Sequence, residues 1–145
     1  MGITFDGKLV CGNTKDYEST YKGKLEYGVG CGYYLLKDGK LKMQSADTAL
    51  NPYTAVALTS DGGFVIICVD GRPNLRKGKS ESVSRYDMVT LLWDLDLNYT
   101  DAYILDGGGS TEMVVKEGNA LKTQNDPSDG KSRPLTDIIA VIISE

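Results

Sequence analysis

The stretch YTAVALTSDGGFVIICVD, residues 53–70, decides the fold because it contains two apolar runs joined by a glycine-rich turn. Residues 53–58 and 64–69 have the length and the β-branched content of strands, and the turn at 61–63 is typical of a hairpin. The second run, FVIICV, is apolar without a break, which is typical of a strand that is covered on both faces. The sequence therefore predicts a hairpin whose second strand lies in the centre of a sheet.

Three further hairpins are predicted from Asp-Gly or Glu-Gly pairs that stand between short apolar runs. They lie in ITFDGKLV (3–10), YYLLKDGKLKM (33–43) and TEMVVKEGNALKT (111–123). The run TDIIAVIIS (136–144) predicts another strand buried on both faces, and QNDPSDGKSRP (124–134) has the composition of a loop.

One helix is predicted over SRYDMVTLLWDLDL, residues 84–97. Ser84 and Asp87 have the spacing of a capping box, with Asp in place of the usual Glu. The predicted apolar face consists of Met88, Leu91, Leu92 and Leu95. Because this helix stands between the strands at 64–69 and 101–105, the three elements predict a parallel crossover unit.

The composition predicts one soluble domain over residues 1–145. The chain is 41% hydrophobic and 25% charged, with a net charge of −4, so we expect no nucleic-acid polymer and no membrane as a partner. The predicted fold class is α+β, a mixed and largely antiparallel sheet with one main helix and a parallel crossover unit.

The cysteine and histidine counts limit the compartment and the catalytic groups that this protein can use. Cys11, Cys31 and Cys68 are odd in number and widely spaced, which indicates a reducing compartment, and the N-terminus lacks a signal-peptide pattern, so we expect a cytoplasmic protein. The chain contains no histidine, which excludes histidine-based catalysis and histidine metal ligands.

Two carboxylates follow the strands of the predicted crossover unit. Asp70, in CVDGR, and Asp106, in ILDGGGS, are each the first polar residue after an apolar strand, and each precedes glycine. Because parallel strands end at the same edge of a sheet, both side chains are predicted at one rim, where open sheets bind ligands. An Asp-Gly pair alone is also an ordinary turn signal, as at Asp6 and Asp38.

The three glycines after Asp106 predict a close approach between backbone and ligand. Successive glycines turn amide N–H groups toward an anion, and Ser110 adds a hydroxyl donor. The GK[ST] ending of a nucleotide-binding P-loop is missing. We therefore expect an oxyanion or phosphate cradle with a carboxylate at its mouth. Arg72 and Arg133 are candidates to hold the phosphate, and a surface ion pair is the alternative for each.

These segments together resemble the phosphodiester glycosidase family. The resemblance rests on residues 51–72, on Ser80, on the capped helix, and on AYILDGGGSTEMVV (102–115) and NDPSDGKSRP (125–134), in that order. It implies a family-like core over residues 51–145, preceded by divergent hairpins in residues 1–50, and a mixed domain with its active site around these loops.

Carried over position by position, the resemblance implies a defined set of active-site residues. These are Thr54, Asp70, Gly71, Arg72, Asp106, Gly107, Gly108, Gly109, Ser110 and Asp129. The family usually has Arg where this chain has Tyr53. An aromatic residue there could stack on a ring of the ligand.

Two functions fit these residues. The first is hydrolysis of a sugar-1-phosphodiester or nucleotide-sugar type of ligand, with Asp106 as nucleophile or base and Asp70 as its partner. The second is a binding protein that sequesters a cyclic or sugar-nucleotide signalling molecule without cleaving it. Ca²⁺ or Mg²⁺ would suit a site of Asp70, Asp106 and Asp129 together with loop carbonyls. Two copies could complete the pocket as a homodimer.

Overall fold

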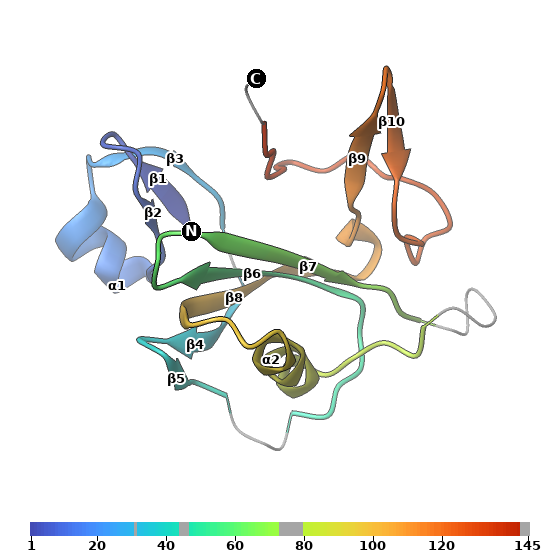
Figure 1. The fold of residues 1–145 in the computed structure, drawn as a ribbon, viewed down its shortest axis with the longest axis horizontal. Coiled ribbons are helices and arrows are strands. Elements are labelled where there is room, and N and C mark those ends of the chain that lie inside the picture. The colour runs from blue at the N-terminus through green and yellow to red at the C-terminus, as the bar shows by residue number, and fades with distance from the viewer. Residues whose placement is uncertain (31, 44–46, 73–79, 143–145) are drawn as a thin grey trace. The chain divides into compact units, whose positions relative to one another are not determined.

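The chain forms two compact units in the computed structural model (Figure 1). One unit combines Met1–Gly30 with Arg133–Glu145, and the other consists of Cys31–Ser132. The structure describes residues 1–30, 32–43, 47–72 and 80–142. Cys31, one of the three cysteines counted above, lies outside these described residues.

The first unit holds a small antiparallel sheet in the order β2-β1-β3. The strands are β1 (Gly2–Thr4), β2 (Leu9–Val10) and β3 (Leu25–Gly28). The hairpin predicted around the Asp6-Gly7 turn is confirmed by β1 and β2. Between β2 and β3 the chain forms α1 (Thr14–Asp16), which continues into a π-helical turn, η1 (Tyr17–Tyr21).

The apolar run at the C-terminal end does not form the predicted strand. Residues 136–142 have no strand conformation, and Ile138 and Ile142 are 77% and 89% exposed. The prediction of a strand buried on both faces was wrong for these residues, while 143 and 144 lie outside the described part. A run of apolar residues supplies the tendency to be buried, but a strand also needs a neighbouring backbone to pair with.

The second unit is built on a five-stranded sheet in the order β5-β4-β8-β6-β7 (Figure 1). Its strands are β4 (Tyr33–Lys37), β5 (Lys40–Leu41), β6 (Tyr53–Thr59), β7 (Phe64–Val69) and β8 (Tyr99–Gly107). All four pairings between neighbours are antiparallel. The predicted β4–β5 and β6–β7 hairpins are confirmed.

The position of β7 differs from the sequence prediction. β7 and β8 each pair antiparallel with β6, so they run in the same direction but are not neighbours. β7 forms an edge of the described sheet, and Phe64 at its start is 39% exposed. The prediction that β7 lies in the centre of the sheet was therefore wrong, and β6 separates the two strands of the predicted crossover unit. None of the residues of β7 is fully buried, so the predicted cover on both faces is not found either. An apolar run also carries no information about the number of hydrogen-bonded edges of a strand.

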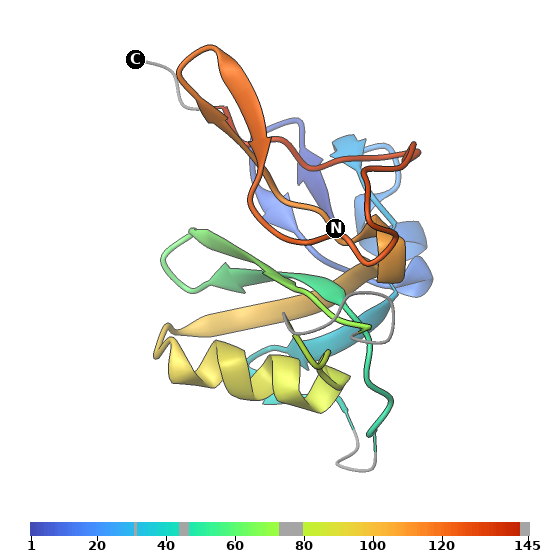
Figure 2. The same ribbon diagram turned by 90° about the vertical axis from the view of Figure 1, so that its right-hand side faces the viewer.

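Helix α2 (Arg85–Asp94) lies along one face of this sheet (Figure 2). The predicted capping box is confirmed, because the backbone N–H of Asp87 donates to Ser84 Oγ at 3.1 Å and that of Ser84 donates to Asp87 Oδ2 at 2.8 Å. The core between helix and sheet contains Leu35, Leu36, Ala55, Ala57, Met88, Val89, Leu92, Ala102 and Ile104.

The buried face of α2 is narrower than predicted. Met88, Val89 and Leu92 are fully buried, whereas Leu91 and Leu95 are 37% and 49% exposed. The helix ends at Asp94, before the last residue of the predicted face, and the stripe that contacts the sheet is rotated toward Val89. Spacing alone identifies a helix with an apolar side, and the sheet selects which edge of that side is covered.

The last hairpin of the unit consists of β9 (Val114–Glu117) and β10 (Ala120–Thr123), as predicted. It is followed by the predicted loop, which has no strand or helix from residue 124 to 134. Within the described residues, every helix is too short or too polar to cross a membrane.

Candidate functional site

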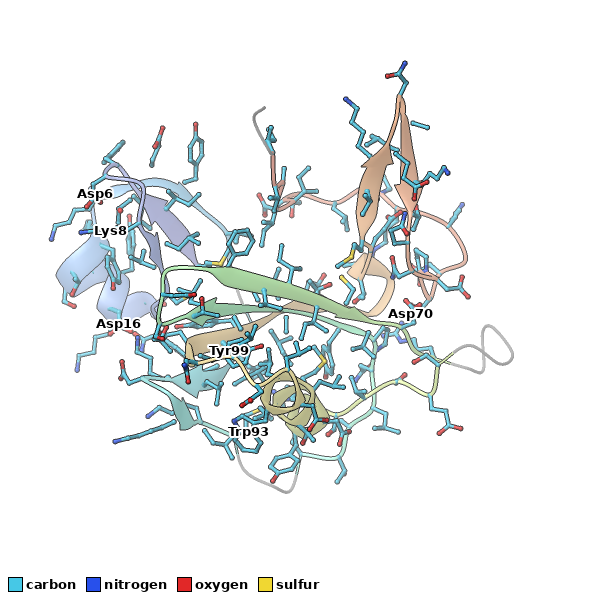
Figure 3. All side chains as sticks on the ribbon, viewed as in Figure 1. Asp6, Lys8, Asp16, Asp70, Trp93 and Tyr99 are labelled. Carbon is cyan, nitrogen blue, oxygen red and sulfur yellow. The ribbon has the colours of Figure 1, made fainter. Side chains whose placement is uncertain are left out.

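The candidate site lies at the rim of the five-stranded sheet where β7 and β8 end and β6 begins. Tyr53, the first residue of β6, is opposite Val69 on one side and Gly107 on the other. Asp70 directly follows the last residue of β7, and Asp106 is the last residue of β8 that has a side chain. The two aspartates therefore lie at the same edge of the sheet. Figure 3 labels Asp70 at this end of β7. The two carboxylates flank the start of β6, as their common strand direction requires.

Asp70 is held by hydrogen bonds at both carboxylate oxygens. Asn125 Nδ2 donates to Oδ1 at 2.8 Å, and the backbone N–H of Asp126 donates to Oδ2 at 2.8 Å. Asn125 also donates to the carbonyl of Thr111 at 2.9 Å and accepts from the backbone N–H of Met113 at 2.8 Å. Asp70 and Asn125 therefore join the end of β7 to the segment after the glycines and to the loop before residue 134.

Asp106 has a different environment. Its side chain is exposed, Oδ1 accepts from the backbone N–H of Gly107 at 2.8 Å, and Oδ2 accepts from Ser110 Oγ at 2.7 Å. These two local donors orient the carboxylate, whereas Asp70 is fixed by a distant segment. The geometry leaves Asp106 as the member of the predicted pair that faces solvent.

The start of the glycine loop is hydrogen-bonded within the chain. Gly107 donates to Asp106, and Gly108 donates to the carbonyl of Pro52 at 3.0 Å. An added Cβ on Gly107 would lie 2.7 Å from the same carbonyl oxygen, closer than real Cβ atoms approach. Two N–H groups that the sequence assigns to an anion cradle are thus engaged by the protein, and Gly107 is required for space.

The next two glycines make room for two charged side chains. A Cβ on Gly108, whose φ is +64°, would lie 2.9 Å from a guanidinium nitrogen of Arg72. A Cβ on Gly109 would lie 2.0 Å from Asp129 Oδ2. The η2 turn (Gly108–Ser110) thus has a cation against one α-carbon and a carboxylate against the next. Close approach by the protein's own groups accounts for the glycines.

Arg72 reaches Gly108 from an unusual backbone conformation. Its φ is +62°, and its backbone N–H donates to Ser82 Oγ at 2.8 Å. Gly71 before it is pressed against the same hydroxyl, since a Cβ there would lie 2.1 Å from Ser82 Oγ and 2.9 Å from Pro52 N.

Thr54 and Tyr53 lie at the start of β6. Thr54 Oγ1 is 3.4 Å from Cys68 Sγ on β7, and burial raises the pKa of that thiol, with Thr54 opposing the shift. The Tyr53 ring packs against the core and against Gly107, whose added Cβ would be 3.0 Å from Tyr53 Cδ1. Tyr53 is thus in contact with the loop in which the other site residues lie.

The predicted metal ligands are not assembled as a set. Among the described residues, no group of three Cys, Asp or Glu side chains lies close enough to hold an ion. Asp70, Asp106 and Asp129 therefore do not fit the predicted Ca²⁺ or Mg²⁺ site, and both oxygens of Asp70 already accept hydrogen bonds. Arg133 belongs to the other unit, and its role at the rim stays a prediction.

Three residues of the site were missed by the sequence reasoning. Pro52 separates Gly71 from Gly107, Ser82 holds Arg72, and Asn125 holds Asp70. Asn125 begins the NDPSDG motif and could have been chosen from it. Ser82 and Pro52 carry no comparable signal, because their roles depend on contacts between distant segments.

Comparison with known proteins identifies the family of this chain. Residues 1–142 match the phosphodiester glycosidase family, so the chain belongs to that family. The match extends through residues 1–50, beyond the segments that carried the resemblance above.

The chain is also similar to part of a much longer bacterial protein. The chain is 36% identical over 115 residues to the SPbeta prophage-derived uncharacterized protein YomE of Bacillus subtilis strain 168. The alignment covers 76% of this chain and 16% of that relative. The chain thus spans a small part of the relative's length.

Proposed function

We propose that this protein hydrolyses the bond between the anomeric carbon of a sugar and a phosphodiester. The observation that carries the proposal is an exposed Asp106 carboxylate, aligned by Gly107 and Ser110, on the loop against which the Arg72 guanidinium lies. Family membership supports this class of reaction.

Each group has a role in the proposed reaction. The phosphate takes the electron pair of the breaking C–O bond and leaves as a phosphomonoester, while a water oxygen becomes bonded to the anomeric carbon. Asp106 either removes the proton of that water or attacks the carbon first, and water then releases the sugar. Arg72 neutralises the charge that grows on the leaving phosphate, and guanidinium groups suit this task because they can bind two oxygens at once.

Asp70 receives a supporting role in this proposal. The donors to Asp70 come from the distant loop at residues 125–126, so a reaction at this carboxylate would break the bonds that hold that loop. The donors to the exposed Asp106 are its own near neighbours Gly107 and Ser110. We therefore assign Asp70 to holding the loop that contains Asn125, and assign the chemistry to Asp106.

Capture without cleavage is the second candidate. It is favoured by Tyr53, which packs against Gly107 at the position where the family usually has a cationic Arg. In that case the ligand would be a cyclic or sugar-nucleotide molecule bound intact.

One experiment separates the two. The protein is incubated with the methyl phosphodiester of N-acetylglucosamine 1-phosphate or with UDP-N-acetylglucosamine, and then denatured before the released compounds are analysed. Free sugar with a phosphorylated product supports hydrolysis, and stoichiometric recovery of intact ligand supports capture.

Asp106→Asn tests the assignment of the chemistry. We expect it to lower turnover by about 10³-fold or more with the fold intact, since the carboxylate is lost and the shape is kept. Full activity in this variant would refute the role of Asp106. Asp61→Asn, at an exposed aspartate in the turn between β6 and β7 and away from the site, is the matched control.

A further inference from the structure

Arg72 and Ser82 form a pair of residues in left-handed conformation joined by a hydrogen bond. Their φ angles are +62° and +70°, and the N–H of Arg72 donates to Ser82 Oγ at 2.8 Å. The other non-glycine residues with positive φ in the described ranges are Asp38 and Asp96, and Asp tolerates this conformation at turns. Arg and Ser adopt it at a cost, so the surrounding structure must hold them there.

The structure anchors this pair on both sides. Val83, next to Ser82, exchanges two backbone hydrogen bonds with Asn51, at 3.0 and 3.2 Å. On the other strand end, Ser80 Oγ donates to the carbonyl of Asp70. The Ser82 hydroxyl is therefore tied to the entry of β6, and through its bond it fixes the backbone that follows β7.

The consequence concerns the direction of the Arg72 side chain. With φ at +62°, the guanidinium lies against Gly108, where an added Cβ would be 2.9 Å from a terminal nitrogen. Rotation of Arg72 to an ordinary negative φ would turn the whole side chain away from the glycine loop. The cation lies against this loop because the backbone is held.

We propose that Ser82 is a positioning residue, whose hydroxyl holds Arg72 in the left-handed conformation so that its guanidinium binds the phosphate group of the ligand. This inference rests on the proposed function for the identity of the anion. Ser82 itself does not touch the ligand. Its loss weakens phosphate binding because Arg72 relaxes to the lower-energy conformation and must return to the strained one when the ligand binds.

A double-mutant cycle tests the proposal with the methyl phosphodiester of N-acetylglucosamine 1-phosphate as the probe. We expect Ser82→Ala to raise KM about tenfold with kcat within about twofold. Arg72→Ala should raise KM at least as much, and the double variant should match Arg72→Ala alone. Independent, multiplying effects of the two substitutions would overturn the proposal.

Three variants separate positioning from general stability. Ser82→Gly removes the hydroxyl but accepts the left-handed conformation, so it keeps the fold if Ser82→Ala does not, and it too should raise KM. Ser82→Asn restores an oxygen acceptor on a residue that tolerates positive φ, and should recover part of the affinity. Ser60→Ala, in the turn just after the far end of β6, should leave KM unchanged, and the melting temperature of every variant is measured.

A binding measurement keeps the outcome clear if the wild type cleaves no probe. The Kd for inorganic phosphate is then measured by NMR on the wild type and the same variants. A similar loss of phosphate affinity in Ser82→Gly and in Arg72→Ala would support the positioning role even though the proposed hydrolysis fails. Loss in Arg72→Ala with an unchanged Ser82→Gly would refute the positioning role alone.

Discussion

The chain uses the dipeptide Asp-Gly in two ways that differ in their physical cause. The pairs Asp6-Gly7 and Asp38-Gly39 turn the chain in hairpins, and Asp70-Gly71 and Asp106-Gly107 stand at the rim of the larger sheet. Gly7 has a φ of +80° with nothing within 4 Å of an added Cβ. Gly107 has a φ of −131°, and an added Cβ would lie 2.7 Å from a backbone oxygen. Glycine is needed for its conformation in the turn and for its small size at the rim.

The same division applies to the aspartates. Asp6 is exposed, and its partners Thr4 and Lys8 belong to its own hairpin. Asp70 accepts hydrogen bonds from Asn125 and Asp126, more than 50 residues further along the chain. The aspartates of the turns are therefore held locally, and Asp70 is held by a distant segment. Asp106 lies between these cases, because its donors Gly107 and Ser110 are local although Gly107 itself packs against a distant backbone.

The largest effect is expected from adding a methyl group at the rim. Gly71→Ala and Gly107→Ala each force a Cβ against the backbone of Pro52, which is buried and cannot move aside. Each should lower the free energy of unfolding by about 3 kcal/mol, as overpacking of a rigid site does. Urea denaturation measures this. An unchanged midpoint for Gly107→Ala would refute the spatial explanation.

A smaller effect on the free energy of unfolding is expected from substitutions at the two rim aspartates, and it should differ between them. Asp70→Asn places an amide NH₂ against the donor of Asn125 or of Asp126, and should cost about 2 kcal/mol of stability because one of these part-buried donors loses its acceptor and faces another donor. Asp106→Asn should change stability by less than about 0.5 kcal/mol, because its side chain is exposed. Equal losses in the two variants would contradict the division between support and chemistry.

Substitution of the turn glycine Gly7 should destabilise the fold less than substitution of the rim glycines. Gly7→Ala meets no neighbour but must adopt a φ of +80°, at a cost of about 1 kcal/mol. Gly7→Asn should cost less, because Asn tolerates this conformation. Thermal unfolding of both variants checks the order. A greater loss for Gly7→Ala than for Gly107→Ala would reverse the comparison.

The smallest effect concerns the titration of the turn aspartates. The Thr4 hydroxyl donates to Asp6, and with Lys8 it holds the pKa of that carboxyl below its ordinary value. Because the pKa is lowered in the folded state, the stabilisation is present above the ordinary pKa of Asp and is lost as pH falls through the lowered one.

Thr4→Val should move the pKa of Asp6 back toward the ordinary value, which NMR titration measures. Asp61, whose pKa is lowered mainly by the hydroxyl of Thr59, serves as the internal control and should not move. An unchanged Asp6 would show that Lys8 is sufficient for the shift.

Local signals in the sequence predicted much of this protein. The four hairpins followed from glycine turns between apolar runs, and the helix followed from Ser84, Asp87 and the residues after them. Asp70 and Asp106 were predicted at one edge of the sheet, and they lie there because β7 and β8 run in the same direction. The turns and the helix cap depend on residues close together in the chain, and the shared edge of the two aspartates depends on the common direction of β7 and β8.

What the sequence determined by itself was therefore the set of turns, the helix cap and the family to which the chain belongs. Only the tertiary structure decided that β6 separates β7 from β8 and that residues 136–142 do not form a strand. It also decided that the side chain of Asp70 holds the loop that contains Asn125, and that Arg72 lies on Gly108. The physical reason is the range of the interactions. Turn and cap preferences act within about four residues, whereas strand order and side-chain contacts are set by segments that meet only when the chain is folded.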